Sequence, residues 1–120
     1  MTEDNAGLLG LDRLIHEPAR LAIVTILNAV ESADFLYLLR EIGLTKGNLS
    51  VHLTKLQEAG YISIEKTYKG KLPLTICRLT EEGGYAFEKY QAQWLKLTGR
   101  VEKKEHARAV PAKAKRLVPA

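Results

Sequence analysis

Hydrophobic residues recur at helical spacing over the first half of the chain and alternate with polar residues over a shorter stretch after it. Pro18 predicts the start of a helix, because proline fits the first helical position, where its missing N–H costs nothing. That helix extends to about Asn28 and is apolar around most of its circumference. Such a helix must be covered on more than one side, so we expect the domain's core on one side and a partner chain on the other. A short amphipathic segment, Leu8 to Leu14, precedes it.

Two more helices are predicted close together. The first extends from Asp34, its N-cap, to Ile42, and Gly43 stops it. Thr45 caps the next helix, which ends at Ala59-Gly60. Only Gly43 and Leu44 separate the first of these helices from the second cap, a length suited to a tight helix-turn-helix.

Residues 61–79 predict a two-stranded β-hairpin with a cationic tip. Tyr61 to Tyr68 alternates apolar and polar positions, as a half-buried strand does. Lys69-Gly70-Lys71 forms the turn, and Leu74 to Leu79 returns as the partner strand with Pro73 at its edge.

The last predicted helix begins after its cap Thr80, and Gly99 lies just past its end. One face of this helix is rich in aromatic residues and consists of Phe87, Tyr90, Trp94 and Leu97. Residues 100–120 contain two prolines and no periodic apolar stripe, so we expect a basic, flexible tail there. The chain is therefore expected to form one mainly α (α+β) domain, residues 8–99, with a three-helix core, the hairpin and a C-terminal helix.

Length and composition limit the possible classes of protein. At 120 residues and 46% hydrophobic residues, the chain supports one domain of ordinary size. No apolar run approaches the roughly 18 to 20 residues that a membrane span needs. The acidic, polar N-terminus does not resemble a secretory signal, so we expect a cytoplasmic protein without a membrane partner.

Catalytic and metal chemistry have little support in the sequence. Cys77 is the only cysteine, which excludes an intrachain disulfide, and its strand-like surroundings favour a packed small residue over a redox sensor. The three histidines fall in separate segments without metal-ligand spacing. Phosphate-binding glycine loops, nucleophile elbows and paired carboxylates are not found. We expect neither an enzyme nor a bound metal or cofactor.

Charge is distributed unevenly along the chain, although the total is only +4. Residues 1–43 hold three basic and seven acidic side chains, whereas residues 44–79 hold six basic and two acidic ones. Residues 100–120 hold seven basic and two acidic side chains. This asymmetry favours a polyanionic partner near the middle of the chain.

The helix after Thr45 has the properties of a helix that contacts DNA bases. Leu49, Leu53 and Leu56 cluster on one side at about 100° per residue, so the opposite side is exposed. That side begins with small or hydrogen-bonding residues around Gly47 and Val51, which allow close approach and contact with a thymine methyl. The candidate contacts on this helix are Thr45, Lys46, Asn48, Ser50, Val51, His52 and Lys55.

Two features of this region keep alternatives open. His52 lies at the margin of the exposed side, where a half-buried, hydrogen-bonded histidine and a phosphate contact are both reasonable. On the hairpin, Lys66, Tyr68, Lys69 and Lys71 surround Gly70 and could contact phosphates or the minor groove, or could form a merely solvated turn.

The order of elements and the phrases NLSVHLTKLQEAGYI and LTEEG resemble the winged helix-turn-helix transcriptional regulators, which include the ArsR-like and MarR-like repressors. The sequence is similar in particular to small uncharacterised regulators of the LTxGNLSxHLxKLEEAGYI type, over about residues 11–98. The resemblance implies that residues 45–60 are the recognition helix and that residues 66–74 form the wing. It does not extend to metal sensing, because residues 35–40 lack the cysteine-rich motif of the ArsR-like sensors.

In such families the first and last helices form a two-fold dimer. The resemblance therefore implies a homodimer interface that includes Leu11, Leu14, Ile15, Ile23, Phe87, Tyr90, Trp94 and Leu97. The expected function is a homodimeric, sequence-specific regulator of transcription that binds double-stranded DNA, with an unidentified small-molecule effector as a further possible partner. The alternatives are a non-sequence-specific nucleic-acid or chromatin-type binder that uses the wing and tail, and a winged-helix protein-interaction module.

Overall fold

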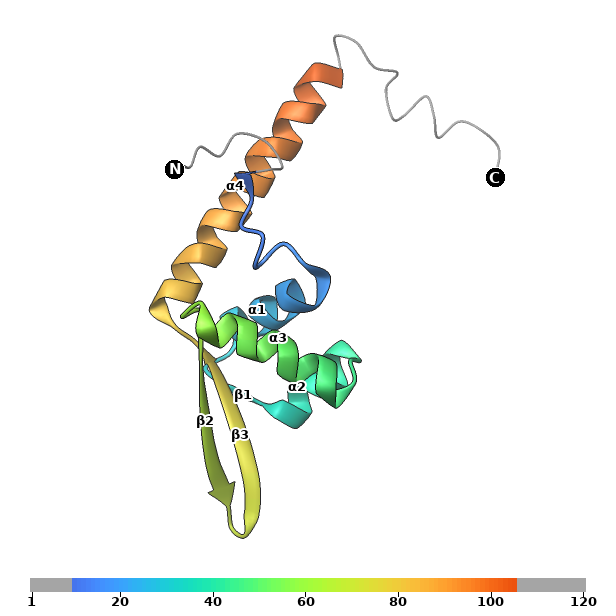
Figure 1. The fold of residues 1–120 in the computed structure, drawn as a ribbon. Helices are drawn as coiled ribbons and strands as arrows, with labels where there is room; N and C mark the ends of the chain where they lie inside the picture. The colour runs from blue at the N-terminus through green and yellow to red at the C-terminus, as the bar shows by residue number, and fades with distance from the viewer. Residues whose placement is uncertain (1–9, 106–120) are drawn as a thin grey trace, which may run out of the picture. The chain divides into compact units, whose positions relative to one another are not determined.

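The computed structural model describes residues 10–105, which belong to two compact units. The first unit is Asp12–Tyr90, and the described part of the second is residues 10–11 and 91–105. The elements are α1 (Pro18–Ala29), β1 (Ala33–Asp34), α2 (Phe35–Ile42), α3 (Lys46–Glu58), β2 (Ile62–Lys69), β3 (Leu72–Leu79) and α4 (Glu81–Glu105). This arrangement of helices and antiparallel sheet confirms the predicted α+β fold class (Figure 1).

The core of the first unit lies between the helices and the base of the sheet. Pro18 begins α1 as predicted, and the Glu17 side chain caps this helix by accepting a hydrogen bond from the N–H of Arg20. In α3, the three predicted leucines are buried, with α1 and β2 packed beside the helix. The core side chains of this unit are Ile15, Ala19, Ile23, Val24, Leu27, Ala33, Leu38, Leu49, Leu53, Leu56, Ile62, Cys77, Phe87 and Tyr90.

The turn between α2 and α3 has the predicted caps. The Asp34 carboxylate accepts a hydrogen bond from the N–H of Tyr37, and the Thr45 hydroxyl accepts one from the N–H of Asn48. Gly43 ends α2 with φ of +81°, a left-handed conformation that a residue with a Cβ adopts only with strain. These contacts set the direction in which α3 leaves α2.

The C-terminus of α3 is closed by a Schellman motif. The N–H of Tyr61 donates to the carbonyl of Leu56 at 2.9 Å, and the N–H of Gly60 donates to that of Gln57 at 2.9 Å. This pair of bonds turns the chain directly from α3 into β2.

The sheet has one more strand than the sequence predicts. β1 pairs antiparallel with β3, so the order is β1-β3-β2. A strand of two residues is too short to show alternation, and Asp34 was recognisable only as a helix cap. The hairpin is also longer than predicted: Leu72 and Pro73 belong to β3, where Pro73 is opposite Tyr68, and the turn is Gly70-Lys71.

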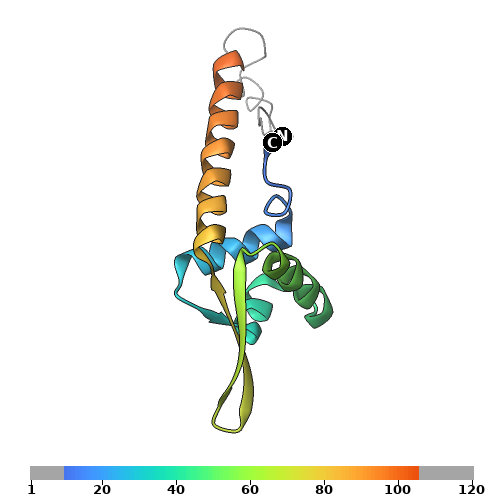
Figure 2. The ribbon, with the colours of Figure 1, turned by 60° about the vertical axis from the view of Figure 1, so that its left-hand side comes forward.

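The hairpin of β2 and β3 extends beyond α1, α2 and α3, with its tip farthest from them (Figure 1 and Figure 2). In both views α2 and α3 lie on the same side of the hairpin. Both helices of the helix-turn-helix therefore lie beside the same face of the hairpin.

The ends of the described chain differ from the predictions. Thr80 caps α4 as predicted, accepting a hydrogen bond from the N–H of Gly83, but the helix continues past Gly99 to Glu105. The expected stop at Gly99 is wrong, because a helical glycine costs only about 1 kcal/mol and good helix formers follow it. Beyond Glu105, the predicted flexible tail lies outside the described residues.

The segment before α1 is a turn in its described part, not a helix. The Asp12 carboxylate accepts hydrogen bonds from the N–H groups of Leu14 and Ile15. Such side-chain bonds compete with helical ones. Among residues 10–105, no helix has the combination of length and apolar character needed to cross a membrane.

Replacement of Gly83 tests the contact between α4 and the start of β2. A Cβ at Gly83 would overlap the backbone carbonyl of Tyr61, which cannot move away as a flexible side chain could. We expect Gly83→Ala to lower the free energy of unfolding by about 2 kcal/mol, measured by chemical denaturation.

Gly84→Ala is the matched control, because its Cβ would meet only Leu79 Cδ2 at 3.8 Å. It should be neutral or stabilise the protein by about 0.5–1 kcal/mol, and equal losses in both variants would contradict the packing argument.

Cys77 should react slowly with thiol reagents in the native protein. Its side chain is fully buried, and burial, with a smaller contribution from the Asp34 charge, raises the pKa of the thiol from 9.0 to about 11. Because the thiolate is the reactive form, this shift alone slows labelling about 100-fold below pH 9. Labelling with a chromogenic disulfide, compared in native and urea-unfolded protein, measures the effect, and equal rates would contradict it.

Candidate nucleic-acid interface

The exposed side of α3 is polar and lacks bulky side chains at its N-terminal end. All the predicted contacts on this helix except His52 are exposed: Thr45, Lys46, Asn48, Ser50, Val51 and Lys55. The helical period places Val51 near the middle of this side, with Ser50 on one flank and Asn48 and Lys55 on the other. A helix with such a side can approach base edges closely.

A groove of about 440 Å³ separates α3 from the wing. Its walls on α3 include Ser50, Thr54 and Gln57, and its walls on the sheet include Lys66 and Thr75. The structure thus brings Lys66 of the wing and Ser50 of α3, which are 16 residues apart in sequence, into the walls of one groove. Polar side chains and one cation line this groove, together with apolar side chains that include Leu53 and Ile64.

Two polar side chains of α3 in this groove were absent from the predicted contacts. Thr54 and Gln57 are exposed and share the stripe of Ser50, at positions i+4 and i+7. The helical period could have identified the stripe. Only the position of β2 and β3 shows that it is the flank of α3 that faces the wing.

The cationic residues of the wing do not all lie on one face. Lys66 and Tyr68 continue the face of β2 that carries the buried Ile62, whereas Lys69 is on the opposite face and Lys71 is in the turn. All four are exposed, and Tyr68 retains 70% of its accessible surface. Lys66 is therefore beside α3, and Lys69 and Lys71 are at the tip.

His52 belongs to a small polar network between α3 and α1. Its side chain is only 19% exposed, and its Nδ1 lies 3.0 Å from Nη1 of Arg20. Arginine has only donors, so Nδ1 accepts this hydrogen bond. Glu17 Oε1 lies 3.9 Å from the same nitrogen, too far for a hydrogen bond. This is the half-buried, hydrogen-bonded arrangement that the sequence left as one alternative.

Two further hydrogen bonds connect the segment before α1 to α1 itself and to the chain just after α3. Arg20 also donates from Nε to the carbonyl of Leu14 at 2.6 Å. Asp12 Oδ2 accepts a hydrogen bond from the Tyr61 hydroxyl at 2.6 Å, just after the C-terminus of α3. Burial, with this bond and the nearby carboxylates, raises the pKa of Tyr61 well above its usual range. The hydroxyl therefore stays protonated and continues to donate.

Most of the predicted dimer-interface residues are buried within a single chain. Ile15 and Ile23 have no accessible surface, and Leu11, Phe87 and Tyr90 retain at most 5%. The Tyr90 hydroxyl lies 2.7 Å from His16 Nδ1, and burial raises the pKa of Tyr90. These five side chains have little surface for a second copy. Leu14 and Leu97 are partly exposed, and Trp94 retains 42% of its surface.

A helix-turn-helix followed by a β-hairpin that shares a groove with its second helix defines a protein of the winged helix class. The chain belongs to the family of the winged helix DNA-binding domain, whose model matches residues 19–98. It is 34% identical over 91 residues to the uncharacterized protein MJ0432 of Methanocaldococcus jannaschii, covering 75% of this chain and 98% of that protein.

Solved structures have the same fold at lower sequence identity. The transcriptional regulator homologue from Pyrococcus horikoshii OT3 superposes with a TM-score of 0.71 at 22% identity, covering 75% of this chain and 89% of its own. NadR in complex with 4-hydroxyphenylacetate superposes with a TM-score of 0.57 at 19% identity, covering 78% and 67%. These likenesses confirm the winged helix fold.

The contact between Arg20 and His52 can be measured by a double-mutant cycle. We expect Arg20→Met and His52→Leu to destabilise the protein separately and to couple by about 1 kcal/mol, because the half-buried hydrogen bond exists only when both are present. The measurement is the free energy of unfolding in urea.

The control cycle is Arg78→Ala with Glu65→Ala. That ion pair has the same 3.0 Å separation but its side chains are 45% and 58% exposed. Its coupling should be below about 0.5 kcal/mol. A coupling between Arg20 and His52 no larger than this control would mean that Arg20 does not position α3.

Proposed function

We propose that the protein is a homodimeric, sequence-specific DNA-binding regulator of transcription. The observation that carries the proposal is the groove in which Ser50, Thr54 and Gln57 of α3 face Lys66 of the wing. This groove combines a polar side of α3, which is suited to contact base edges, with the Lys66 ammonium, which is suited to bind phosphates. The family match to a winged helix DNA-binding domain supports the same function.

In this proposal α3 enters the major groove with its N-terminal half. Asn48, Ser50 and Lys55 supply hydrogen bonds to base edges or phosphates, and Val51 contacts a thymine methyl. Thr45 and Lys46, at the N-terminus of the helix, contact the backbone, where the helix dipole favours phosphate. His52 acts mainly by holding α3 against Arg20.

The wing contributes affinity that depends on salt and little on sequence. Lys66 and Tyr68 contact the backbone next to α3, and Lys69 and Lys71 reach phosphates or the minor groove from the tip. Bound cations are released from DNA for each phosphate that a lysine neutralises, so each contact contributes to the salt dependence.

Dimer formation through α4 completes the proposal. Trp94 and Leu95 of α4 retain 42% and 70% of their accessible surface, which makes them better interface candidates than the buried residues of the predicted set. Two copies would place their recognition helices in successive major grooves, about 34 Å apart, on a pseudo-palindromic site. We also infer a cytoplasmic location, no catalytic activity and a response to a small molecule. The last point has support from NadR, which has the same fold and was solved with 4-hydroxyphenylacetate.

The DNA interface can be tested by gel shift on a site selected from random DNA. We expect Asn48→Ala combined with Lys55→Ala to weaken binding at least about tenfold, since base contacts of this kind are worth about 1–3 kcal/mol. Lys66→Ala should instead reduce the slope of log K against log salt by about 1. Lys89→Ala removes the same charge from an exposed position of α4 and serves as the control.

Unchanged affinity in the first variant would contradict the proposed role of α3. Selection from random DNA also separates the main alternative, because a binder that uses only the wing and tail would yield no motif. A protein-interaction module would bind no DNA at any salt concentration.

Self-association can be tested by sedimentation velocity. Leu95→Lys should shift the protein toward the monomer at micromolar concentration, because it buries a charge if this face is an interface. Lys96→Glu changes the charge at the neighbouring exposed residue and should leave the association unchanged. A wild-type protein that sediments as a monomer would contradict the homodimer.

A further inference from the structure

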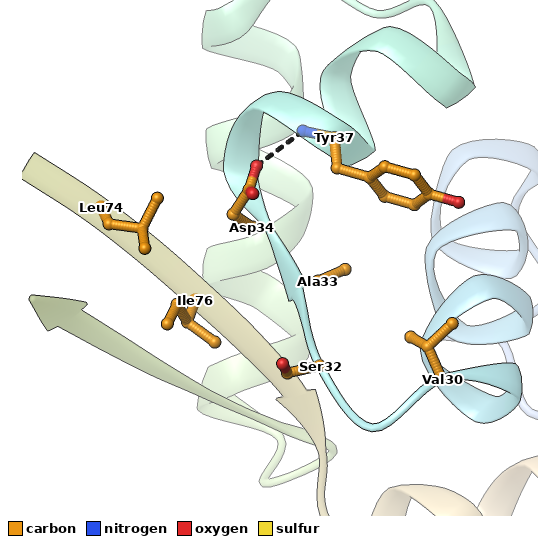
Figure 3. A pocket seen from close by; sticks show the side chains of 7 residues that line it. All are labelled: Val30, Ser32, Ala33, Asp34, Tyr37, Leu74 and Ile76. Atoms are coloured by element: carbon orange, nitrogen blue, oxygen red, sulfur yellow. Dashed lines mark hydrogen bonds between the residues drawn. The ribbon is translucent and has the colours of Figure 1, made fainter. Parts of the chain in front are cut away.

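A second hollow lies on the opposite face of β3 from the groove between α3 and the wing. Side chains alternate along a strand, so Thr75 lines the groove beside α3, whereas Leu74 and Ile76 line this second pocket. The pocket has a volume of about 420 Å³, within the range of small-molecule sites. Its other walls come from the end of α1, β1 and the first turn of α2 (Figure 3).

The lining combines apolar surface with one charged group. Val30 and Tyr37 remain 40% and 37% exposed, and Leu74 and Ile76 are partly exposed. Asp34 is the only charged side chain among the lining residues. It is an acid in a domain whose middle segment is basic, so this pocket differs in charge from the surface around the wing.

Asp34 has room for a further hydrogen bond. Among the hydrogen bonds of residues 10–105, its carboxylate accepts one, at Oδ1 from the N–H of Tyr37 at 2.8 Å (Figure 3). An ionised carboxylate can accept several more through its two oxygens. The charge of Asp34 also helps to raise the pKa of the Cys77 thiol, although burial is the larger cause.

We propose that this pocket binds a small organic ammonium ion with an apolar or aromatic body, and that Asp34 is its counter-charge. The ammonium donates a charge-assisted hydrogen bond to the Asp34 carboxylate, and the body lies on Leu74 and Ile76. The Tyr37 ring already has a cation near it, since the Arg40 guanidinium carbon is 5.9 Å from the ring centroid. Because Arg40 already occupies the neighbourhood of the Tyr37 ring, we place the ligand's ammonium at Asp34 and its body along the apolar walls.

Such a ligand would couple to the DNA surface through two elements. It would touch β1 and α2, and Asp34 is the N-cap of α2. It would also touch Leu74 and Ile76 of β3, and Thr75 between them lines the groove beside α3. A ligand that favours one angle between the wing and α2 would change the spacing of Lys66 and α3. The coupling rests on the proposed DNA-binding function, whereas the binding of the ligand does not.

The binding step is tested with phenethylamine as the probe, in ¹H–¹⁵N correlation spectra of the full chain without DNA. We expect saturable shifts at the amides of Asp34, Tyr37 and Ile76. The isosteric anion phenylacetate and the neutral 2-phenylethanol should bind at least tenfold more weakly. Shifts of equal size and affinity with phenylacetate, or no saturable shift with phenethylamine, would overturn the proposal.

Asp34→Asn provides a matched variant. Asparagine is as good an N-cap as aspartate, so the variant should fold and keep α2 capped while losing the charge. It should bind phenethylamine at least tenfold more weakly, with the affinity for 2-phenylethanol unchanged. Glu31→Gln removes an adjacent exposed acid outside the pocket lining and should leave the affinity unchanged. Loss of affinity in Glu31→Gln equal to that in Asp34→Asn would overturn the role of Asp34.

A gel shift with saturating phenethylamine tests the coupling separately. A change in DNA affinity of threefold or more that is absent in Asp34→Asn supports it. If the probe binds and DNA affinity stays constant, the coupling is overturned and the binding site stands. If the protein binds no DNA at all, the proposed function fails, and the spectra still decide whether the pocket binds an ammonium.

Discussion

The burial of Leu49, Leu53 and Leu56 is the constraint on which the rest of the site depends. These three side chains retain at most 3% of their accessible surface. A helix has a fixed period, so anchoring one side of α3 determines what the other side presents. Ser50, Thr54 and Gln57 consequently face the wing, and Val51 faces outward. A mutation that released α3 from the core would rotate every candidate contact, whatever its own chemistry.

Polar contacts at the middle and at the C-terminal end of α3 complete what apolar packing cannot specify. Leucine packing fixes the face of a helix more strongly than its position along its axis, whereas a hydrogen bond has a defined direction. The Arg20 bond to His52 holds the middle of α3 against α1, and Thr80 ties the start of α4 to the carbonyl of Gly60. Since each of these bonds contributes only about 1 kcal/mol, their role is mainly to position the helix.

β3 connects the two hollows of the first unit. Thr75 lines the groove shared with α3, and its neighbours Leu74 and Ile76 line the pocket that contains Asp34. The period of two along a strand puts these surfaces back to back. The proposed DNA surface and the proposed ligand pocket therefore share β3 as a common wall.

The sequence by itself determined the local features: Asp34, Thr45 and Thr80 as caps, Gly43 as a helix stop, the leucine stripe of α3 and the existence of the hairpin. Caps, stops and periods depend on neighbours within a few residues, which a sequence displays directly. Tertiary structure alone decided the pairing of Ala33-Asp34 with β3, the burial of Ile15 and Ile23 within one chain, and the fixing of His52 by Arg20. These features depend on partners distant in sequence, which no local pattern encodes.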